Sequence, residues 1–451
     1  MKKEENHSKE QPNEPPRKSW FRRPRFQYSI STLLLITAIF ALWLGHVTNR
    51  ARKQREAVKE LTAVGALISY DWEYHDDGEY NIDAELPGWK WLHKLLGEDY
   101  FQEAVSVSFT GFSKPGGDYM VSMDLLTPVD DDPVLTENHF NHLKSLPRLS
   151  SLEIENRCPF SHPDFWKAVI NVKHFSMYDS CTFDEDGFGD QELRGIGSLK
   201  NLISLYLCSK AVSTASLEEI GKLTNLQSLV LEDVEFHDED LAYLKNLKSL
   251  RSMHLCVQEV EGNGLKYLPA GLEHLEIHGL LSGVALKNLR HLKSLNVLIL
   301  ENGEFLTNEG LQALGCLDSL RELEVSWDNS LTGDFEGLKG LKGLKKLDLS
   351  GLRLSGQDIE KLGCLPNLTH LDLSCDGLAE GEMRCFEKLK SVTHLTLWCR
   401  KLNEEELEHL KKMPKLQLVE FPLSIDLEQP AKTRIEKRLQ GVNIGWDHGP
   451  L

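Results

Sequence analysis

Apolar residues recur along most of the chain in one pattern of four positions, apolar-x-x-apolar-x-x-apolar-x-apolar. Neighbouring copies follow one another at a nearly constant spacing, with one longer step between Met177 and Leu207. One copy departs from the pattern, because Pro269 replaces its first apolar residue. A repeat of this kind predicts a solenoid, since a single unit cannot bury its own apolar edge and needs a copy on each side. The copies end at Ile154, Met177, Leu207, Leu231, Leu255, Ile277, Leu300, Val325, Leu349, Leu373, Leu397 and Phe421.

Two hydrophobic periods alternate within each unit. In "LKKLDL", residues 344 to 349, Leu347 and Leu349 flank Asp348, and this period of two predicts a short strand with both leucines pointing inward. Over residues 359 to 365 the apolar residues stand three apart, which predicts a short helix or 3₁₀ segment packed on the strands. The expected fold is therefore an α/β solenoid with one strand and one helical segment in each unit.

The pattern resembles the leucine-rich repeat, L-x-x-L-x-L-x-x-N/C-x-L, over residues 136 to about 421. This resemblance implies a horseshoe of about 12–13 repeats of ~24 residues, with parallel strands on the concave face and short helices on the convex face. One position departs from the family. Where the family keeps Asn or Cys, this chain has Lys210, Val234, Gln258 and Asp376.

The regions outside the repeats predict an anchor and two caps. Val442 and Ile444 follow Val419 and Phe421 at close to the repeat spacing, which predicts one last strand that closes the stack. We expect a disordered charged tail at 1–25, a transmembrane helix at 26–48, a basic juxtamembrane helix at 49–65, an N-terminal cap at 66–135, the solenoid at 136–425 and a C-terminal cap at 426–451.

The uncharged stretch from 26 to 47 is long enough to span a ~30 Å hydrocarbon layer. We interpret it as an uncleaved signal-anchor, with a cleaved signal peptide as the alternative. Basic residues flank it on both sides, so the positive-inside rule gives no clear orientation. Lys2, Lys3 and Lys9 favour a cytoplasmic N-terminus, with the repeats outside the cytoplasm. The resemblance to bacterial single-pass, membrane-anchored leucine-rich-repeat proteins implies a bacterial plasma membrane.

Motifs for catalysis, nucleotides or zinc are missing from the sequence, so we expect no enzyme and no cofactor. A dense polar cluster over residues 71–77 is the one place where catalytic groups could gather. The net charge is −18, which disfavours a nucleic-acid partner because phosphate binding needs clustered Lys and Arg.

Nine cysteines and seventeen histidines add few specific expectations. Cys375 and Cys399 occupy the same place in adjacent units, and they are a candidate disulfide or two unbonded thiols. We interpret Cys316 and Cys364 as packed thiols. Three histidines approach a cluster, at positions 254, 274 and 278. We expect them to be ordinary surface side chains rather than a metal site, because the third residue of the set, His274, falls outside the strand core.

Alternation leaves one polar stripe exposed on the strand face, and acidic residues dominate it. We predict that this face binds a protein or peptide, in particular a basic one, with two tryptophans as aromatic anchors. The alternative is that the acids only solubilise the surface. The candidate binding residues are Tyr206, Glu232, Asp233, His254, Glu276, His278, Glu301, Glu324, Trp327, Asp348, Asp372, Trp398 and Glu420.

Two functional classes follow from this organisation. The first is a non-enzymatic, membrane-anchored module for protein–protein interaction. The second is a substrate-recognition adaptor of a larger catalytic assembly, as leucine-rich repeats serve in F-box-type receptors of ubiquitin ligases. The span occupies the place where an F-box-like helical module would be expected, so the first class is favoured.

Overall fold

A computed structural model of the chain describes residues 30–74, 81, 84–109, 136–155, 164–178, 188–235, 237–257, 261–279, 281–302, 307–326, 334–374, 378–398, 404–421 and 429–446. The chain divides into two compact units, Met1–Ala51 and Arg52–Leu451. The expected tail at 1–25 lies outside the described residues.

Helix α1, Ile30–Ala63, is a continuous helix of 34 residues. It runs through both of the segments expected to be helical, 26–48 and 49–65, and residues 26–29 lie outside the described residues. Its end matches the prediction at Gly65, where a left-handed φ of 88° allows the Gly65 N–H to bond Thr62 O and the Ala66 N–H to bond Leu61 O. Among the described helices, α1 is the one long and apolar enough to cross a membrane, and its apolar window is fully exposed. The helix is compatible with a membrane anchor or a signal sequence.

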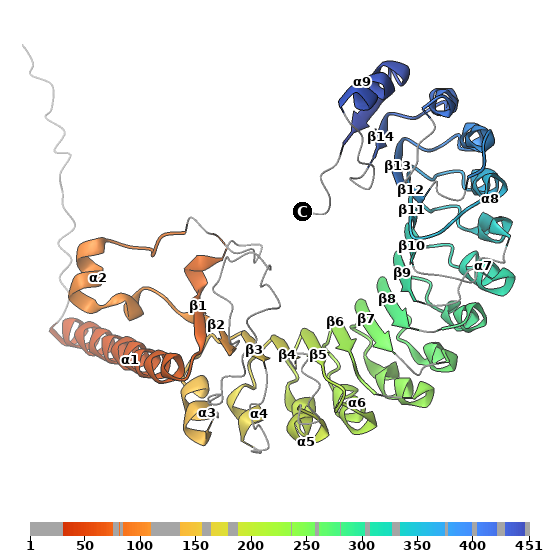
Figure 1. Ribbon diagram of the computed structural model, residues 1–451. Coiled ribbons are helices and arrows are strands. Elements are labelled where there is room, and N and C mark those ends of the chain that lie inside the picture. The colour runs from red at the N-terminus through yellow and green to blue at the C-terminus, as the bar shows by residue number, and fades with distance from the viewer. Residues whose placement is uncertain are drawn as a thin grey trace, which may run out of the picture. The chain divides into compact units, whose positions relative to one another are not determined.

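The described strands of the second unit form one sheet of 15 strands in chain order. β1 pairs antiparallel with β2, and every later pair is parallel (Figure 1). The strands are β1 (Leu67–Tyr70), β2 (Ala104–Phe109), β3 (Ser151–Glu155), β4 (His174–Tyr178), β5 (Ser204–Cys208), β6 (Ser228–Glu232), β7 (Ser252–Val257), β8 (His274–Gly279), β9 (Val297–Glu301), β10 (Glu322–Ser326), β11 (Lys346–Leu349), β12 (His370–Ser374), β13 (His394–Trp398), β14 (Leu418–Glu420) and β15 (Asn443–Gly445).

The register of the sheet confirms the predicted repeats. From β3 to β14, all twelve pattern copies supply the strands, including the copy that contains Pro269. Leu323, Leu347 and Leu371 are direct partners in neighbouring strands, and each is at most 1% exposed. Buried partners of this kind continue along the whole stack, so the inward side chains of adjacent repeats form one core.

The structure adds one strand at the start of the stack and changes the register at its end. β2 lies within the expected N-terminal cap, yet it pairs parallel with β3 and buries Val107 opposite Leu152. At the other end the last strand forms as predicted, but Ile444 pairs with Val419 and not with Phe421. The predicted register was therefore wrong at this strand, because the chain runs two residues further between the paired positions than the predicted alignment of Ile444 with Phe421 assumed. Helix α9 (Gln429–Arg438) precedes β15.

Backbone hydrogen bonds join each repeat to the next in a regular way. The residue just before a strand uses its carbonyl to accept two N–H groups from the following repeat. Lys345 O, for example, accepts from Thr369 N and His370 N, both at 2.9 Å. The same arrangement recurs from Ser150 to Thr393. These bonds satisfy backbone groups at the point where each chain segment enters the sheet, which fixes the register between neighbours.

Short helical segments occupy the outer side of the curve, opposite the strands (Figure 1). This confirms the predicted mixture of α and 3₁₀ turns. Ser355 caps α8 by accepting a hydrogen bond from Asp358 N, while the Asp358 carboxylate accepts from Ser355 N. The segments are α3 (Glu137–Lys144), α4 (Phe165–Ala168), α5 (Asp190–Leu193), η4 (Ile196–Ser198), α6 (Thr214–Ile220), η5 (Asp238–Asn246), η6 (Asn263–Tyr267), η7 (Gly283–Leu289), α7 (Asn308–Leu314), η8 (Phe335–Gly340), α8 (Gly356–Lys361), η9 (Leu362–Cys364), η10 (Glu382–Lys388) and η11 (Glu406–Lys412).

Both ends of the sheet carry extra elements. Before β2 lie β1, η1 (Asp71–Glu73), α2 (Lys90–Leu96) and η2 (Glu98–Tyr100). After β14 lie α9 and β15, where Trp446 stacks on Phe421 with ring centroids 5.3 Å apart. The polar cluster at 71–77 is partly structural, because Asp71 accepts from Glu103 N and Glu73 accepts from Tyr70 N. Its last three residues lie outside the described residues.

The described cysteines are free, and one expectation about them was wrong. Cys316 is exposed and not packed, because α7 ends at Leu314 and the thiol lies in the loop that follows, donating to Gln312 O at 3.3 Å. Cys364 is half-buried, and burial raises the pKa of its thiol. Cys375 and Cys399 lie outside the described residues, so their pairing stays a prediction.

Candidate functional site

The strand face of the second unit exposes one residue between the two buried side chains of each strand, and the parallel register aligns these residues into a row. We call this row the central row. Members of the central row on adjacent strands are direct partners in the sheet. Figure 1 shows the strands on the inner side of the curve. The central row contains Ser108, Glu153, Ser176, Tyr206, Val230, His254, Glu276, Ile299, Glu324, Asp348, Asp372, Thr396 and Glu420.

A second row follows, one position after the second buried side chain of each strand. It contains Glu155, Tyr178, Cys208, Glu232, Cys256, His278, Glu301, Ser326, Ser374 and Trp398. Nearly all the predicted binding residues that the structure describes fall in these two rows. Asp233 is the exception, because it follows β6 in a bend with a left-handed φ of 51°. Trp327 lies outside the described residues.

Carboxylates in the first part of the face receive hydrogen bonds from tyrosines. The Tyr178 hydroxyl donates to Glu153 at 3.1 Å, and the Tyr206 hydroxyl donates to Glu232 at 2.7 Å. Burial and the bond to Glu232 raise the pKa of Tyr206, so its hydroxyl stays protonated as a donor. The rings of Tyr178 and Tyr206 meet edge to face with centroids 6.1 Å apart. These contacts join strands β3 to β6.

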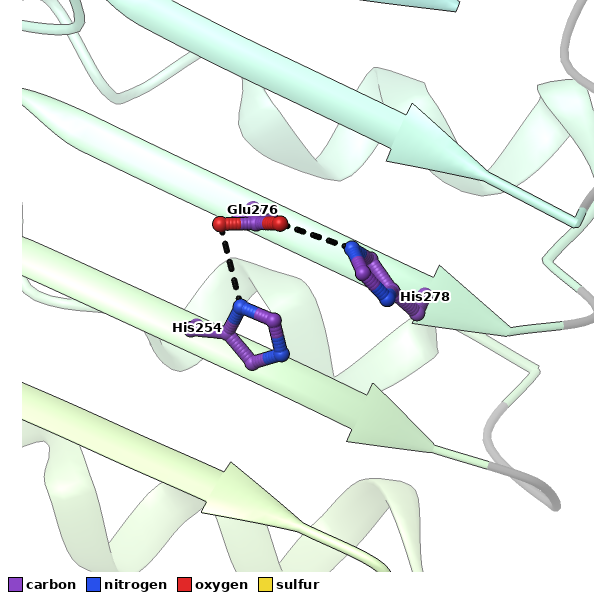
Figure 2. Close-up of side chains that lie close together, drawn as sticks. All are labelled: His254, Glu276 and His278. Carbon is purple, nitrogen blue, oxygen red and sulfur yellow. Dashed lines mark hydrogen bonds and ion pairs between the residues drawn. The ribbon is translucent and has the colours of Figure 1, made fainter. Parts of the chain in front are cut away.

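Two histidines meet one carboxylate in the middle of the face (Figure 2). His254 on β7 places Nδ1 3.0 Å from Glu276 Oε2, and His278 on β8 places Nε2 2.7 Å from Glu276 Oε1. The two imidazole rings lie side by side, with centroids 4.7 Å apart. Glu276 thus holds both rings in place, one with each carboxylate oxygen.

The outer nitrogen of each ring faces a further carboxylate. His254 Nε2 lies 3.6 Å from Glu232, and His278 Nδ1 lies 3.6 Å from Glu301. Burial opposes ionisation of Glu276, but hydrogen bonds and charge from the two histidines outweigh it, so the pKa of Glu276 lies below its ordinary value. All five residues were among the predicted site residues, but the two histidines were grouped with His274, whose Nε2 is 4.0 Å from Glu276.

The last part of the face has a different electrostatic character. Glu324, Asp348 and Asp372 stand side by side on β10, β11 and β12. Burial raises the pKa of both Glu324 and Asp372, and the negative charge of Asp348 between them raises both further. The positive charge of Lys346 lowers the pKa of Glu324 and Asp372, but its Nζ is engaged 2.5 Å from Glu322. We call Glu324, Asp348 and Asp372 the acidic column.

The acidic column makes stability depend on pH in a defined direction. Asp372→Asn is expected to stabilise the folded chain at pH 7, because burial and the charges of Asp348 and Glu420 disfavour the charged form of Asp372 more than Thr396 and Lys346 favour it. A raised folded pKa means that stability is lost as pH rises, so the advantage of the Asn variant should shrink toward pH 3.8 and below. Thermal unfolding of both proteins at the two pH values measures this, and a variant less stable at pH 7 would contradict it.

The end of the face adds an aromatic group. Trp398, the last residue of β13, is 37% exposed and sits beside Ser374 of β12 in the second row. At the start of the same two strands, His370 and His394 stack with centroids 4.4 Å apart and interplanar angle 9°. This pair was not among the predicted site residues. Its signal was present in the sequence, since both histidines hold the same place before the buried strand leucines.

Comparison with known proteins gives structural matches alone. A scan against protein-family models finds no match, and neither does a search of curated proteins. Among solved structures, an internalin from Listeria monocytogenes matches with 18% identity and a TM-score of 0.40, covering 61% of this chain and 92% of that one. A leucine-rich-repeat protein from Leptospira interrogans matches with 20% identity and a TM-score of 0.35, covering 70% of this chain and 87% of that one.

The chain's own repeats define its class. Each unit contributes one buried L-x-L strand to a parallel sheet and one short helical segment to the opposite side, and the strands stay in register from repeat to repeat. This is the architecture of a leucine-rich-repeat solenoid. A solenoid of this kind presents an extended concave surface, and the function has to be argued from the residues on that surface.

Proposed function

We propose that the protein is a membrane-anchored interaction module that binds a basic segment of a protein or peptide on its strand face. The observation that supports this most is the acidic column of Glu324, Asp348 and Asp372. Three carboxylates held side by side repel one another, and a bound cation relieves that repulsion. Trp398 lies on β13, the strand next to β12, which holds Asp372, and its ring is partly exposed beside the column.

The two parts of the face divide the task. In the first part, the carboxylates of Glu153, Glu232 and Glu276 already receive hydrogen bonds or ion pairs from tyrosine and histidine. In the acidic column, the raised pKa of Glu324 and Asp372 reports unfavourable charge. A lysine or arginine of a partner therefore gains most from the column, and we place the basic segment there.

Anchoring is the second part of the proposal. We assign the apolar part of α1 to the membrane and the repeats to the outside of the cytoplasm. The length and exposure of α1 support a span. Exposed Cys316 provides the test of orientation, because a membrane-impermeant maleimide should label it in intact cells. Labelling only after permeabilisation would place the repeats in the cytoplasm.

The adaptor role in a larger catalytic assembly is favoured by none of the contacts described above.

Neutralising the column should weaken binding without unfolding the chain. The triple variant Glu324→Gln, Asp348→Asn, Asp372→Asn is expected to bind basic peptides about 5- to 150-fold more weakly, which corresponds to about 1–3 kcal/mol for three charge pairs at the protein surface. The peptides are those that the full-length wild type selects from a displayed random library. Kd is measured by titration at two salt concentrations, and the wild-type affinity should fall as salt rises.

The matched control removes the same charge from the opposite side of the repeats. Three glutamates are exposed on α7, η8 and α8, namely Glu309, Glu336 and Glu360. The triple variant Glu309→Gln, Glu336→Gln, Glu360→Gln should keep wild-type affinity. Equal losses in the two triple variants would indicate a net-charge effect and not a site. Selected peptides without Lys or Arg enrichment would also contradict the proposal.

A further inference from the structure

We propose that His254, Glu276 and His278 form a binding site for a zinc ion on the strand face. One donor atom from each residue lies within 4.8 Å of the other two. A tetrahedral zinc ion with bonds of ~2.0–2.2 Å holds its donors roughly 3.3–3.6 Å apart. Small side-chain rotations would therefore close the site around the ion. Figure 2 shows the three side chains, with both histidines in contact with Glu276.

The donors stand on rigid positions of the sheet. His254 and Glu276 are direct partners on β7 and β8, and His278 follows Glu276 by two residues on the same strand. Two residues apart in a strand means the same face, so all three side chains project to one side. The side chains are 17%, 24% and 25% exposed, which restricts their rotation but leaves the site open to solvent.

The surroundings of the histidines match those of metal ligands. A ligating histidine usually directs its second ring nitrogen at a carboxylate or carbonyl, which fixes the tautomer and strengthens the donor. Here His254 Nδ1 and His278 Nε2 face Glu276, and the remaining ring nitrogens each face another carboxylate, Glu232 or Glu301, at 3.6 Å. The carboxylates and histidines of a carboxylate–histidine–ion–histidine–carboxylate arrangement are therefore already in position around the proposed ion.

Charge and donor type select the ion. Two imidazole nitrogens and one carboxylate oxygen suit zinc and its first-row neighbours rather than calcium or magnesium, which prefer all-oxygen sites. With neutral histidines, the carboxylates of Glu232, Glu276 and Glu301 give the cluster a charge of −3, which a divalent cation offsets. Three protein donors leave one coordination position open on the solvent side for water.

A second histidine pair on the same face provides the internal comparison. His370 and His394 stack in parallel at 4.4 Å, and the structure pairs their Nδ1 atoms with Thr369 and Thr393 and not with a shared carboxylate. Histidines alone on this face should therefore not suffice for tight binding. The zinc-site proposal can fail or hold whatever the outcome for the basic partner, because none of the proposed zinc ligands belongs to the acidic column.

The test is titration of the full-length chain, in detergent, stripped of metal and purified without a histidine tag. Co²⁺ is expected to bind one ion per chain with visible absorption of a tetrahedral site, and Zn²⁺ should displace it. His254→Ala and His278→Ala should abolish the absorption, while His370→Ala and His394→Ala should leave it unchanged. Glu232→Gln should weaken binding by about 10- to 100-fold, the usual effect of an outer-shell carboxylate.

Folding is monitored separately by circular dichroism of each metal-free variant. If an alanine variant fails to fold, Glu276→Gln replaces it, because the amide keeps the side chain's shape and removes the charged donor. Zn²⁺ should raise the melting temperature of the wild type and not that of Glu276→Gln. Absence of Co²⁺ binding, or binding that persists in folded His254→Ala and His278→Ala chains, would overturn the proposal and leave a hydrogen-bonded cluster only.

Discussion

Replacing Phe335 by alanine is expected to lower the free energy of unfolding by about 3–5 kcal/mol, the usual cost of truncating a buried aromatic side chain. Phe335 opens η8 on the outer side of the repeats and is 0% exposed. Its side chain belongs to the single core that runs through all the repeats, so the cavity would weaken the interfaces with both neighbours. The effect should be a lower midpoint in chemical denaturation of the full-length chain in detergent.

The control is the next residue in the chain. Glu336 is exposed, and Glu336→Ala should change stability by no more than about 0.5 kcal/mol. Equal effects of the two substitutions would mean that Phe335 is not part of a continuous core. A broader transition in Phe335→Ala would be consistent with the account, because repeats coupled to nearest neighbours lose cooperativity when one interface weakens.

Exchanging Ile36 and Ile39 for arginine is expected to release the chain from the membrane. Each arginine near the middle of a span costs about 2.5–3.5 kcal/mol on the insertion scale, so the pair costs about 5–7 kcal/mol. Both isoleucines are more than half exposed on α1, so the repeats do not depend on them for packing. The readout is the fraction of full-length protein that stays in membranes after carbonate washing.

The control places two arginines where the apolar segment of α1 ends. Thr48 and Asn49 lie at this border, so Thr48→Arg and Asn49→Arg should leave the chain in the membrane. Retention of the Ile36, Ile39 variant would contradict the assignment of α1 as a span. A wild-type chain that is found soluble and lacks its first residues would instead favour a cleaved signal peptide.

Repeat spacing was enough to predict the fold. Each pattern copy pairs a period-two segment with a period-three segment, and together these define a strand, a turn of helix and their faces. Even the copy with Pro269 could be placed, because Leu275 and Ile277 keep the buried strand positions. Alternation predicts a strand at β2, but in a hairpin of the cap and not in the stack. Residues 110 to 145 separate β2 from the first pattern copy, so spacing gave no hint that it belongs to the stack.

The candidate site was only half accessible from sequence. Alternation predicts which residues are exposed on the strand face, and His254, Glu276 and His278 were among them. It does not predict contacts, which depend on register and rotamers. Glu276 contacts His278 on its own strand, β8, and His254 on the neighbouring strand, β7. The contact with His254 exists only because β7 and β8 are aligned.

Close packing on the outer side was likewise invisible in the sequence. Gly340 shows the reason, since a Cβ at this position would overlap the carbonyl oxygen of Gly315 in the preceding turn. The two glycines belong to different repeats, and either could have been a simple loop residue by its sequence context. Contacts between repeats set this requirement, and periodicity alone does not reveal how closely the turns approach.

Site-specific photo-crosslinking on the two sides of the repeats tests the central claim, binding on the strand face, most directly. A photoreactive amino acid replaces Thr396, in the central row between Asp372 and Glu420, or Glu360, exposed on α8, in full-length chains in native membranes. The account predicts that a protein or peptide is captured at Thr396, that capture fails at Glu360, and that the acidic-column triple variant loses it. Capture at Glu360 alone, or capture at Thr396 that survives the triple variant, would contradict the account.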